Sequence, residues 1–128
     1  MVPRAEITDF WQLVFNPSSM ERLTHDIMKL ELKLPETERL QFLAGQYIEF
    51  LLKGGKRRAF SIANAPHDDK FIELHIRHVP YGQFGDYVFD GMKVKELLRL
   101  EGPLGSFYLR EESERSIIMV VGGTGFAP

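Results

Sequence analysis

Arg58, Phe60 and Ser61 are the residues whose types and spacing best suit the binding of a charged, flat ligand. Strand side chains alternate between two faces, so Arg58 and Phe60 are expected on one face and Ser61 on the other. An arginine offers a planar fork of donors that matches phosphate oxygens, and an aromatic ring offers a stacking surface. The segment predicts a site for a ligand with a phosphate at one end and a ring at the other.

The same residues also have a purely structural interpretation. Arg57 and Arg58 follow the turn Lys53–Lys56, and arginines beside a turn are commonly solvated. A phenylalanine in a strand is commonly part of the core. The sequence of this one segment leaves both interpretations open, so the elements around it must decide.

Short alternating segments with glycine and proline turns run through most of the chain, which favours an antiparallel all-β barrel or sandwich. Apolar and charged residues alternate most clearly over Met28–Leu34 and Ile72–Arg77. Tyr47–Leu52 and Arg57–Ile62 flank a Gly-Gly turn and predict a hairpin. Near the N-terminus we expect a first strand within Ala5–Val14 and a loop at Phe15–Ser19. A short helix is expected over Phe84–Asp90, with Phe84 and Val88 on one face. We also expect a strand at the end of Lys93–Glu101 and a returning segment at Ser106–Leu109.

The C-terminal part has a different pattern. The charged segment Arg110–Arg115 is typical of a linker, and Ile117–Val121 is an uninterrupted apolar run that predicts a strand buried on both faces, as in parallel α/β sheets. The glycine-rich segment Gly122–Pro128 follows directly. A strand followed by such a loop normally opens a helix whose N-terminal amides bind phosphate.

Composition excludes several classes of function. The 128 residues carry a net charge of −2, which argues against non-specific binding of nucleic acid. There is no cysteine, so this chain forms no disulfide, no thiolate metal site and no cysteine-held iron–sulfur cluster, and no metal site is expected. No signal peptide and no apolar run long enough to span a membrane is visible, and we expect a cytoplasmic protein. His75 is expected on a strand surface, and the acidic pairs Asp68-Asp69 and Glu111-Glu112 in solvated turns.

Four segments together resemble the ferredoxin–NADP reductase family of flavoenzymes. They are Gly45-Gln46-Tyr47, Arg58-Ala59-Phe60-Ser61, Gly102-Pro103-Leu104-Gly105, and Gly122-Gly123-Thr124-Gly125 followed by Pro128. The chain is most similar to bacterial reductases that pass electrons from NAD(P)H to flavins or iron–sulfur proteins, such as the reductase of dideoxyhexose synthesis. The resemblance implies a six-stranded antiparallel Greek-key FAD-binding barrel in residues 1–110. It also implies a truncated start of an α/β NAD(P)H-binding domain in residues 111–128.

The resemblance also implies site residues. Arg58 would bind the flavin phosphate, Phe60 would pack on the isoalloxazine ring, and Ser61 would act catalytically by hydrogen bonding near N5. The other implied cofactor-binding residues are Ala59, Ile76, Arg77 and His78, the backbone of Gly82, Gln83, Phe84 and Gly85, and, for the nicotinamide nucleotide, Gly123, Thr124 and Gly125. The chain departs from the family pattern at Tyr81, where many relatives have glycine, and at Gly85, where serine or threonine is common.

The implied function is an oxidoreductase that passes hydride from NAD(P)H to FAD and electrons on to a flavin, an iron–sulfur protein or another acceptor. Two alternatives stay open: a non-catalytic flavin- or nucleotide-binding barrel, and an OB-like barrel for single-stranded nucleic acid. The helix that should follow Gly122–Pro128 is not in the sequence, so we expect the 128 residues alone not to achieve full turnover.

Overall fold

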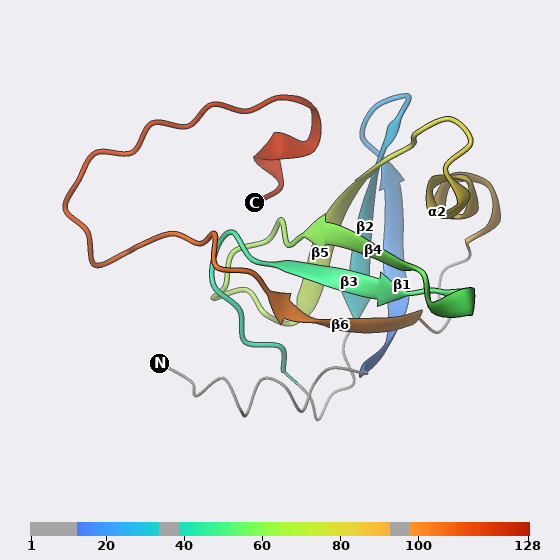
Figure 1. Cartoon of the computed structure of the whole chain (residues 1–128), viewed down its shortest axis with the longest axis horizontal. Helices are drawn as coiled ribbons and strands as arrows, with labels where there is room; N and C mark the ends of the chain where they lie inside the picture. The colour runs from blue at the N-terminus through green and yellow to red at the C-terminus, as the bar shows by residue number, and fades with distance from the viewer. Residues whose placement is uncertain (1–12, 34–38, 93–97) are drawn as a thin grey trace.

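An antiparallel sheet with strand order β4-β3-β6-β1-β2-β5 accounts for most of the regular secondary structure in the described part of the chain (Figure 1). The computed structural model describes residues 13–33, 39–92 and 98–128. The strands are β1 (Leu13–Arg22), β2 (Ile27–Lys33), β3 (Tyr47–Leu51), β4 (Arg57–Ser61), β5 (Phe71–Arg77) and β6 (Leu98–Leu104). A short helix α2 (Gln83–Asp86) continues into the π-helical turn η2 (Tyr87–Gly91), and 3₁₀ turns lie at η1 (Lys53–Gly55) and η3 (Gly123–Phe126).

Strands β2 and β5 form where the sequence alternates most regularly. They pair antiparallel, with Leu30 opposite Leu74, and every second residue of each strand is buried. Because successive side chains point to opposite faces, one face of the pair supplies the core and the other carries charge. Both predicted strands are confirmed.

The β3–β4 hairpin is also confirmed. Gly54 and Gly55 both have positive φ, at 77° and 75°, which residues with a Cβ adopt only under strain. The N–H of Leu52 donates to the carbonyl of Lys56 across the turn, at 2.8 Å. The turn brings Arg57 and Arg58 back alongside β3.

The predicted loop at Phe15–Ser19 is wrong, because β1 runs through it. Its first residues pair with β6 and its later residues with β2, and the pairing register shifts between Pro17 and Ser19. A bulge of this kind accommodates a proline, which has no N–H to give to the ladder. Of the expected first strand, residues 5–12 lie outside the described part of the chain.

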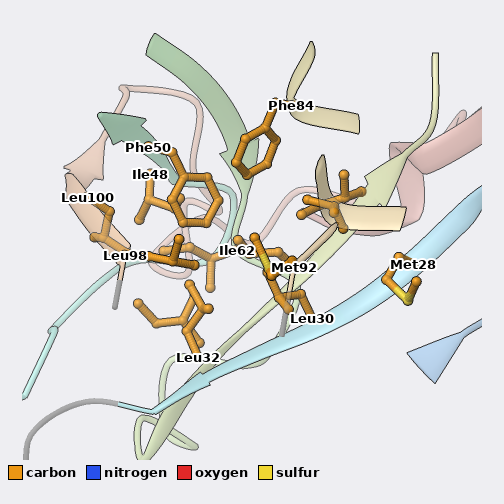
Figure 2. Packing of buried hydrophobic residues seen from close by; sticks show 14 of the residues in the cluster. Met28, Leu30, Leu32, Ile48, Phe50, Ile62, Phe84, Met92, Leu98 and Leu100 are labelled. Atoms are coloured by element: carbon orange, nitrogen blue, oxygen red, sulfur yellow. The ribbon is translucent and has the colours of Figure 1, made fainter. Parts of the chain in front are cut away.

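The core lies between the sheet and the short helical segment (Figure 2). Phe84 and Val88 are both buried, as the expected helix over Phe84–Asp90 required, although the regular α-helical part ends at Asp86. The other fully enclosed side chains include Leu30, Leu32, Leu40, Ile48, Phe50, Ile62, Ile72, Leu74, Ile76 and Leu100. Leu40 is buried although it lies outside every regular element of the described chain.

Strands β4 and β5, the two ends of the sheet order, approach each other. Ile62, just beyond β4, forms an isolated antiparallel bridge with Leu74, and the N–H of Ala63 donates to the carbonyl of Glu73 at 2.8 Å. The antiparallel all-β class with one short helix is confirmed. Closure into a six-stranded Greek-key barrel stays a prediction.

The expected strand at Ile117–Val121 is not formed in this structure. These five side chains are between 40% and 91% exposed, and no described strand lies alongside to complete a ladder. The return expected at Ser106–Leu109 likewise lacks strand pairing within the described residues. The chain after β6 loops away and comes back so that η3 contacts β5 (Figure 1). None of the described helices is long and apolar enough to cross a membrane.

Candidate flavin site

Strand β4 places Arg58 and Phe60 on one face of the sheet and Ser61 on the other. Arg58 pairs with Phe50 and Phe60 with Ile48, so both point to the face of β3 that carries its buried residues. Ser61 pairs with Tyr47 on the other face, which it shares with Ala59. The predicted alternation is therefore confirmed for this strand.

Phe60 lies half-buried against the core. The centroid of its ring lies 5.8 Å from that of Phe50 and 5.4 Å from that of Phe84. The ring centroids of Phe50 and Phe84 are 4.9 Å apart. Figure 2 shows Phe50 and Phe84 facing each other, one from β3 and one from α2. Phe60 is the partly exposed member of this group, because the other two are at least 96% buried. The core thus fixes the ring while leaving part of it accessible.

The two adjacent arginines have different roles. Arg57 pairs with Glu49, at 3.0 Å between Nη1 and Oε2, and with the buried carboxylate of Glu101. The hydrogen bonds that Arg57 donates to these two carboxylates raise its pKa, and the bond to Glu49 has the largest effect. Arg58 is exposed, and within the described residues its guanidinium has no carboxylate partner; Nη1 donates only to the carbonyl of Arg57, at 2.8 Å. Arg58 is therefore free to bind an anion.

The end of β5 supplies a second group of predicted residues. The side chain of Ile76 is fully buried, so only its backbone can face a ligand. Arg77 is exposed and pairs with Asp26, with 3.2 Å between Nε and Oδ2. Nε2 of His78 lies 2.5 Å from Oδ1 of Asp86. The imidazole ring stacks on Phe89, with 4.8 Å between ring centroids.

The turn from β5 into α2 is tightly built around two glycines. A Cβ at Gly82 would lie 2.9 Å from the carbonyl oxygen of Val79, and one at Gly85 would lie 3.1 Å from Cδ2 of His78. The N–H of Gly82 donates to Val79 at 2.9 Å. Between them, the backbone of Gln83 begins the helix and Phe84 anchors it in the core. The close approach at Gly85 gives a physical reason why position 85 is glycine and not the serine or threonine of the family pattern, because a side chain at this position would crowd His78.

The glycine-rich segment near the C-terminus lies beside this second group. A Cβ at Gly123 would lie 3.6 Å from Nη1 of Arg77. Thr124 and Gly125 are half-buried, and the N–H of Ala127 donates to the carbonyl of Thr124 at 3.0 Å. The structure thus brings Gly123 next to Arg77, although 46 positions separate them in the sequence.

The segments Gly45–Tyr47 and Gly102–Gly105, which also resemble the family, contact each other and have a structural role. Gln46 is buried, accepts a hydrogen bond from the N–H of Leu43 and donates to the carbonyl of Gly105, at 2.9 and 3.0 Å. A Cβ at Gly105 would lie 2.8 Å from the ring of Tyr47. These contacts fix the start of β3 against the end of β6.

The sequence pattern of the oxidoreductase FAD-binding domain family matches residues 16–108. This chain belongs to the oxidoreductase FAD-binding domain family. It is 48% identical over 110 residues to the CDP-6-deoxy-L-threo-D-glycero-4-hexulose-3-dehydrase reductase of Yersinia pestis, covering 86% of this chain and 33% of that protein. It is 38% identical over 110 residues to the ferredoxin–NAD(P)⁺ reductase component of the naphthalene 1,2-dioxygenase system of Pseudomonas putida, covering 86% of this chain and 33% of that protein.

Solved structures show the same fold. The ferredoxin reductase in carbazole 1,9a-dioxygenase superposes with a TM-score of 0.83 at 30% identity, over 91% of this chain and 36% of that one. The FAD-binding domain described here thus spans about a third of the length of these relatives. The antiparallel fold and the family are therefore established on independent grounds.

The residues of this FAD-binding domain fit the cofactor of its family. FAD has two flat ring systems joined through a pyrophosphate. The structure offers two exposed arginines, Arg58 and Arg77, for phosphate oxygens and a partly exposed ring, Phe60, for stacking. The close approaches at Gly82 and Gly85 leave little room for a side chain at either of these two positions. Among the described residues, no cluster of three or more histidine, aspartate and glutamate side chains could hold a metal ion.

Sequence reasoning missed the acidic partners of this site. Asp26 and Asp86 hold Arg77 and His78, and Glu49 with Glu101 holds Arg57. Asp26 is also held locally, because its Oδ1 accepts a hydrogen bond from the hydroxyl of Thr24 at 2.8 Å. That hydrogen bond is the largest cause that lowers the pKa of Asp26 below its ordinary value, and His25 and Arg77 lower the pKa further.

Proposed function

We propose that this chain is the FAD-binding part of an NAD(P)H-dependent oxidoreductase. The observation that carries the proposal is the face of β4. There Arg58, which has no carboxylate partner among the described residues, lies together with Phe60, a partly exposed ring that is anchored in the core. FAD, when bound, supplies the capacity to accept a hydride from NAD(P)H and to release electrons to an acceptor.

In this proposal the residues of β4 bind and orient the flavin. Arg58 donates to a phosphate and Phe60 supports the ring system. Ala59, on the opposite face with Ser61, contributes its backbone to the cofactor site. Ser61 offers a hydroxyl at the end of the strand, where it donates a hydrogen bond to the reacting edge of the ring and so acts catalytically. Ser61 is half-buried, which is consistent with a group that touches the ligand without filling the core.

The second group would hold the rest of the cofactor and the nucleotide donor. Arg77 ends β5 and His78 follows it, and the backbone of Ile76 and of Gly82, Gln83, Phe84 and Gly85 would lie along the cofactor, with no side chain at the two glycines. Gly123, Thr124 and Gly125 would contact the nicotinamide nucleotide. The position of Gly123 beside Arg77 supports a meeting of the two ligands at this end of the molecule.

The proposal includes the finer points of organisation. We infer that the sheet closes into a six-stranded Greek-key barrel within residues 1–110, supported by the Ile62–Leu74 bridge, and that residues 111–128 begin a nicotinamide nucleotide domain. The name of the Pseudomonas putida relative supports NAD(P)H as the electron donor and an iron–sulfur protein as the acceptor. A free flavin is the other class of acceptor in this proposal. The sequence without cysteine is consistent with a cytoplasmic location.

The test is a titration of the purified chain with FAD, followed by the quenching and spectral shift of the flavin. Saturable one-to-one binding supports the proposal, and no binding by a folded chain contradicts it. The loaded chain is then mixed with NADH or NADPH in a stopped-flow instrument. We expect flavin bleaching far slower than a typical turnover of about 10 per second, because the exposed segment Ile117–Val121 forms no buried strand that would hold the nicotinamide ring against the flavin. Bleaching at that rate would show that the 128 residues suffice.

A further inference from the structure

Asp26 lies in the turn between β1 and β2, yet it contacts the end of β5. Its Oδ2 accepts a hydrogen bond from Nε of Arg77 at 3.2 Å, and its Oδ1 accepts one from the hydroxyl of Thr24 at 2.8 Å. The side chain of Asp26 is 25% exposed and that of Arg77 is 59% exposed. The carboxylate is therefore fixed from its own turn before it meets the arginine.

Asp26 also holds the residue that follows β5, through its backbone. The carbonyl of Asp26 accepts a hydrogen bond from the N–H of His78 at 2.7 Å. Two consecutive residues of the candidate site, Arg77 and His78, are thus tied to one residue of a distant turn. The backbone hydrogen bond at His78 and the side-chain hydrogen bond at Arg77 together restrict the conformations that the Arg77 side chain can adopt.

The pairing uses one particular edge of the guanidinium. Because Nε faces Asp26, the outer edge with Nη1 and Nη2 remains for a ligand, and this edge can bind phosphate oxygens in a bidentate way. Nη1 is also the atom that lies 3.6 Å from the position of a Cβ at Gly123. The outer edge of Arg77 therefore faces the glycine-rich segment.

We propose that Asp26 is a positioning residue, which holds Arg77 so that its outer edge takes a phosphate group beside Gly123. This inference rests on the proposed function. The phosphate belongs either to the pyrophosphate of FAD or to the nicotinamide nucleotide, and both offer the same chemistry to Arg77.

The simplest test is the substitution Asp26→Asn. The amide oxygen of asparagine still accepts the hydrogen bond from Thr24, and the backbone bond to His78 is unchanged, but the amide nitrogen cannot accept from Nε of Arg77. We expect FAD or NAD⁺ affinity to fall by about 3-fold to 10-fold, in the lower part of the range of coupling between contacting residues. Riboflavin, which has no phosphate, should bind the variant and the unchanged chain equally.

The matched control is Asp69→Asn. It removes the same charge and breaks the surface pair that Asp69 forms with Arg39, away from the candidate site residues. This control should leave the affinities for FAD, NAD⁺ and riboflavin unchanged. Melting curves of each variant show whether the fold is retained.

A double-mutant cycle separates positioning from a merely structural ion pair. If Asp26 acts through Arg77, then Asp26→Asn added to Arg77→Ala weakens phosphate-ligand binding no further, within about 2-fold. A loss for FAD alone assigns the phosphate to the flavin, and a loss for NAD⁺ assigns it to the nucleotide. Unchanged affinity for both ligands, or equal losses for riboflavin and FAD, overturns the proposal. Failure of the unmodified chain to bind FAD would instead contradict the proposed function.

Discussion

Arg57 and Arg58 differ in what surrounds them, although they are neighbours of the same type. Arg57 balances the carboxylates of Glu49 and Glu101 on one face of the sheet, whereas Arg58 lies on the other face without a carboxylate partner among the described residues. The alternation of side chains along β4 creates this division. One arginine is therefore structural and the other is available for a ligand.

We predict that Arg58→Ala weakens FAD binding by about 2–3 kcal/mol, or about 30-fold to 150-fold, because a charge-assisted bidentate contact is lost. Arg57→Ala should instead lower the melting temperature, because it leaves two neighbouring carboxylates without their cation. Arg39→Ala, which removes the same charge from a surface pair, is the control for net charge. Isothermal titration with FAD and thermal melts measure both effects. Equal FAD affinity in Arg58→Ala and the unchanged chain would contradict the role of Arg58.

Asp26 should make stability depend on acid pH. Its pKa in the folded protein lies below the ordinary value of 3.8, because Thr24 donates a hydrogen bond to it and because His25 and Arg77 are nearby. A carboxyl group with a lowered folded-state pKa stabilises the fold above its unfolded-state pKa, and this contribution disappears as the pH falls through the folded-state pKa. The stability difference between the unchanged chain and Asp26→Asn should thus be fully present above the ordinary pKa of 3.8 and shrink as the pH falls below that value. Urea unfolding across this range measures it, and a constant difference would argue against the assigned contacts.

At the scale of elements, the sequence predicts strands best where one face is buried. The alternating residues of β2 and β5 and the Gly-Gly hairpin are local signals, and the structure confirms them. The course of β1 could not be predicted from composition, because Pro17 and its neighbours are typical of a loop and only pairing with β2 and β6 makes them a strand. The pair of Asp26 with Arg77 joins positions 51 residues apart, so no local pattern could reveal it.

The loop between β5 and α2 contains a backbone conformation that its residue type disfavours. Tyr81 has a φ of 64° and is 99% exposed, so its ring contributes nothing to the core. Left-handed backbone costs a residue with a Cβ about 1–2 kcal/mol, whereas glycine adopts it freely but loses more entropy on folding. The glycine that many family members have here matches the conformation that the structure shows.

We therefore predict that Tyr81→Gly raises the free energy of unfolding by up to about 1 kcal/mol. Tyr81→Ala is the matched control, since it removes the ring but keeps the Cβ, and it should give no gain. Denaturant unfolding of the three proteins measures the difference. A Tyr81→Gly variant less stable than Tyr81→Ala would show that the loop does not need left-handed backbone at this position.

At the scale of the whole molecule, the sheet and the C-terminal segment differ in how much they are enclosed. The side chains from Leu109 to Gly123 are exposed throughout, while the strands carry the core. Exposed extended backbone with few contacts is where proteases cut first. The division into residues 1–110 and 111–128 therefore has a direct physical test.

Limited digestion with trypsin should cut after Arg110 and Arg115 before any site within the strands. The remaining fragment should keep its cooperative melting transition and bind FAD within about 3-fold of the intact chain, because the residues of β4 and α2 are retained. Mass spectrometry identifies the cut sites, and flavin fluorescence gives the affinity. First cleavage inside β2 or β5, or a fragment that no longer folds, would contradict this division.

The central claim is that the flavin lies on the face formed by β4 and the turn into α2. A titration of the isotope-labelled chain with FAD, followed residue by residue through backbone amide NMR signals, tests it most directly. The account predicts that the largest shifts occur at Arg58–Ser61 and at His78–Asp86, and that β1 and the outer face of β2 change little. Shifts confined to other strands, with those two segments unchanged, would contradict it.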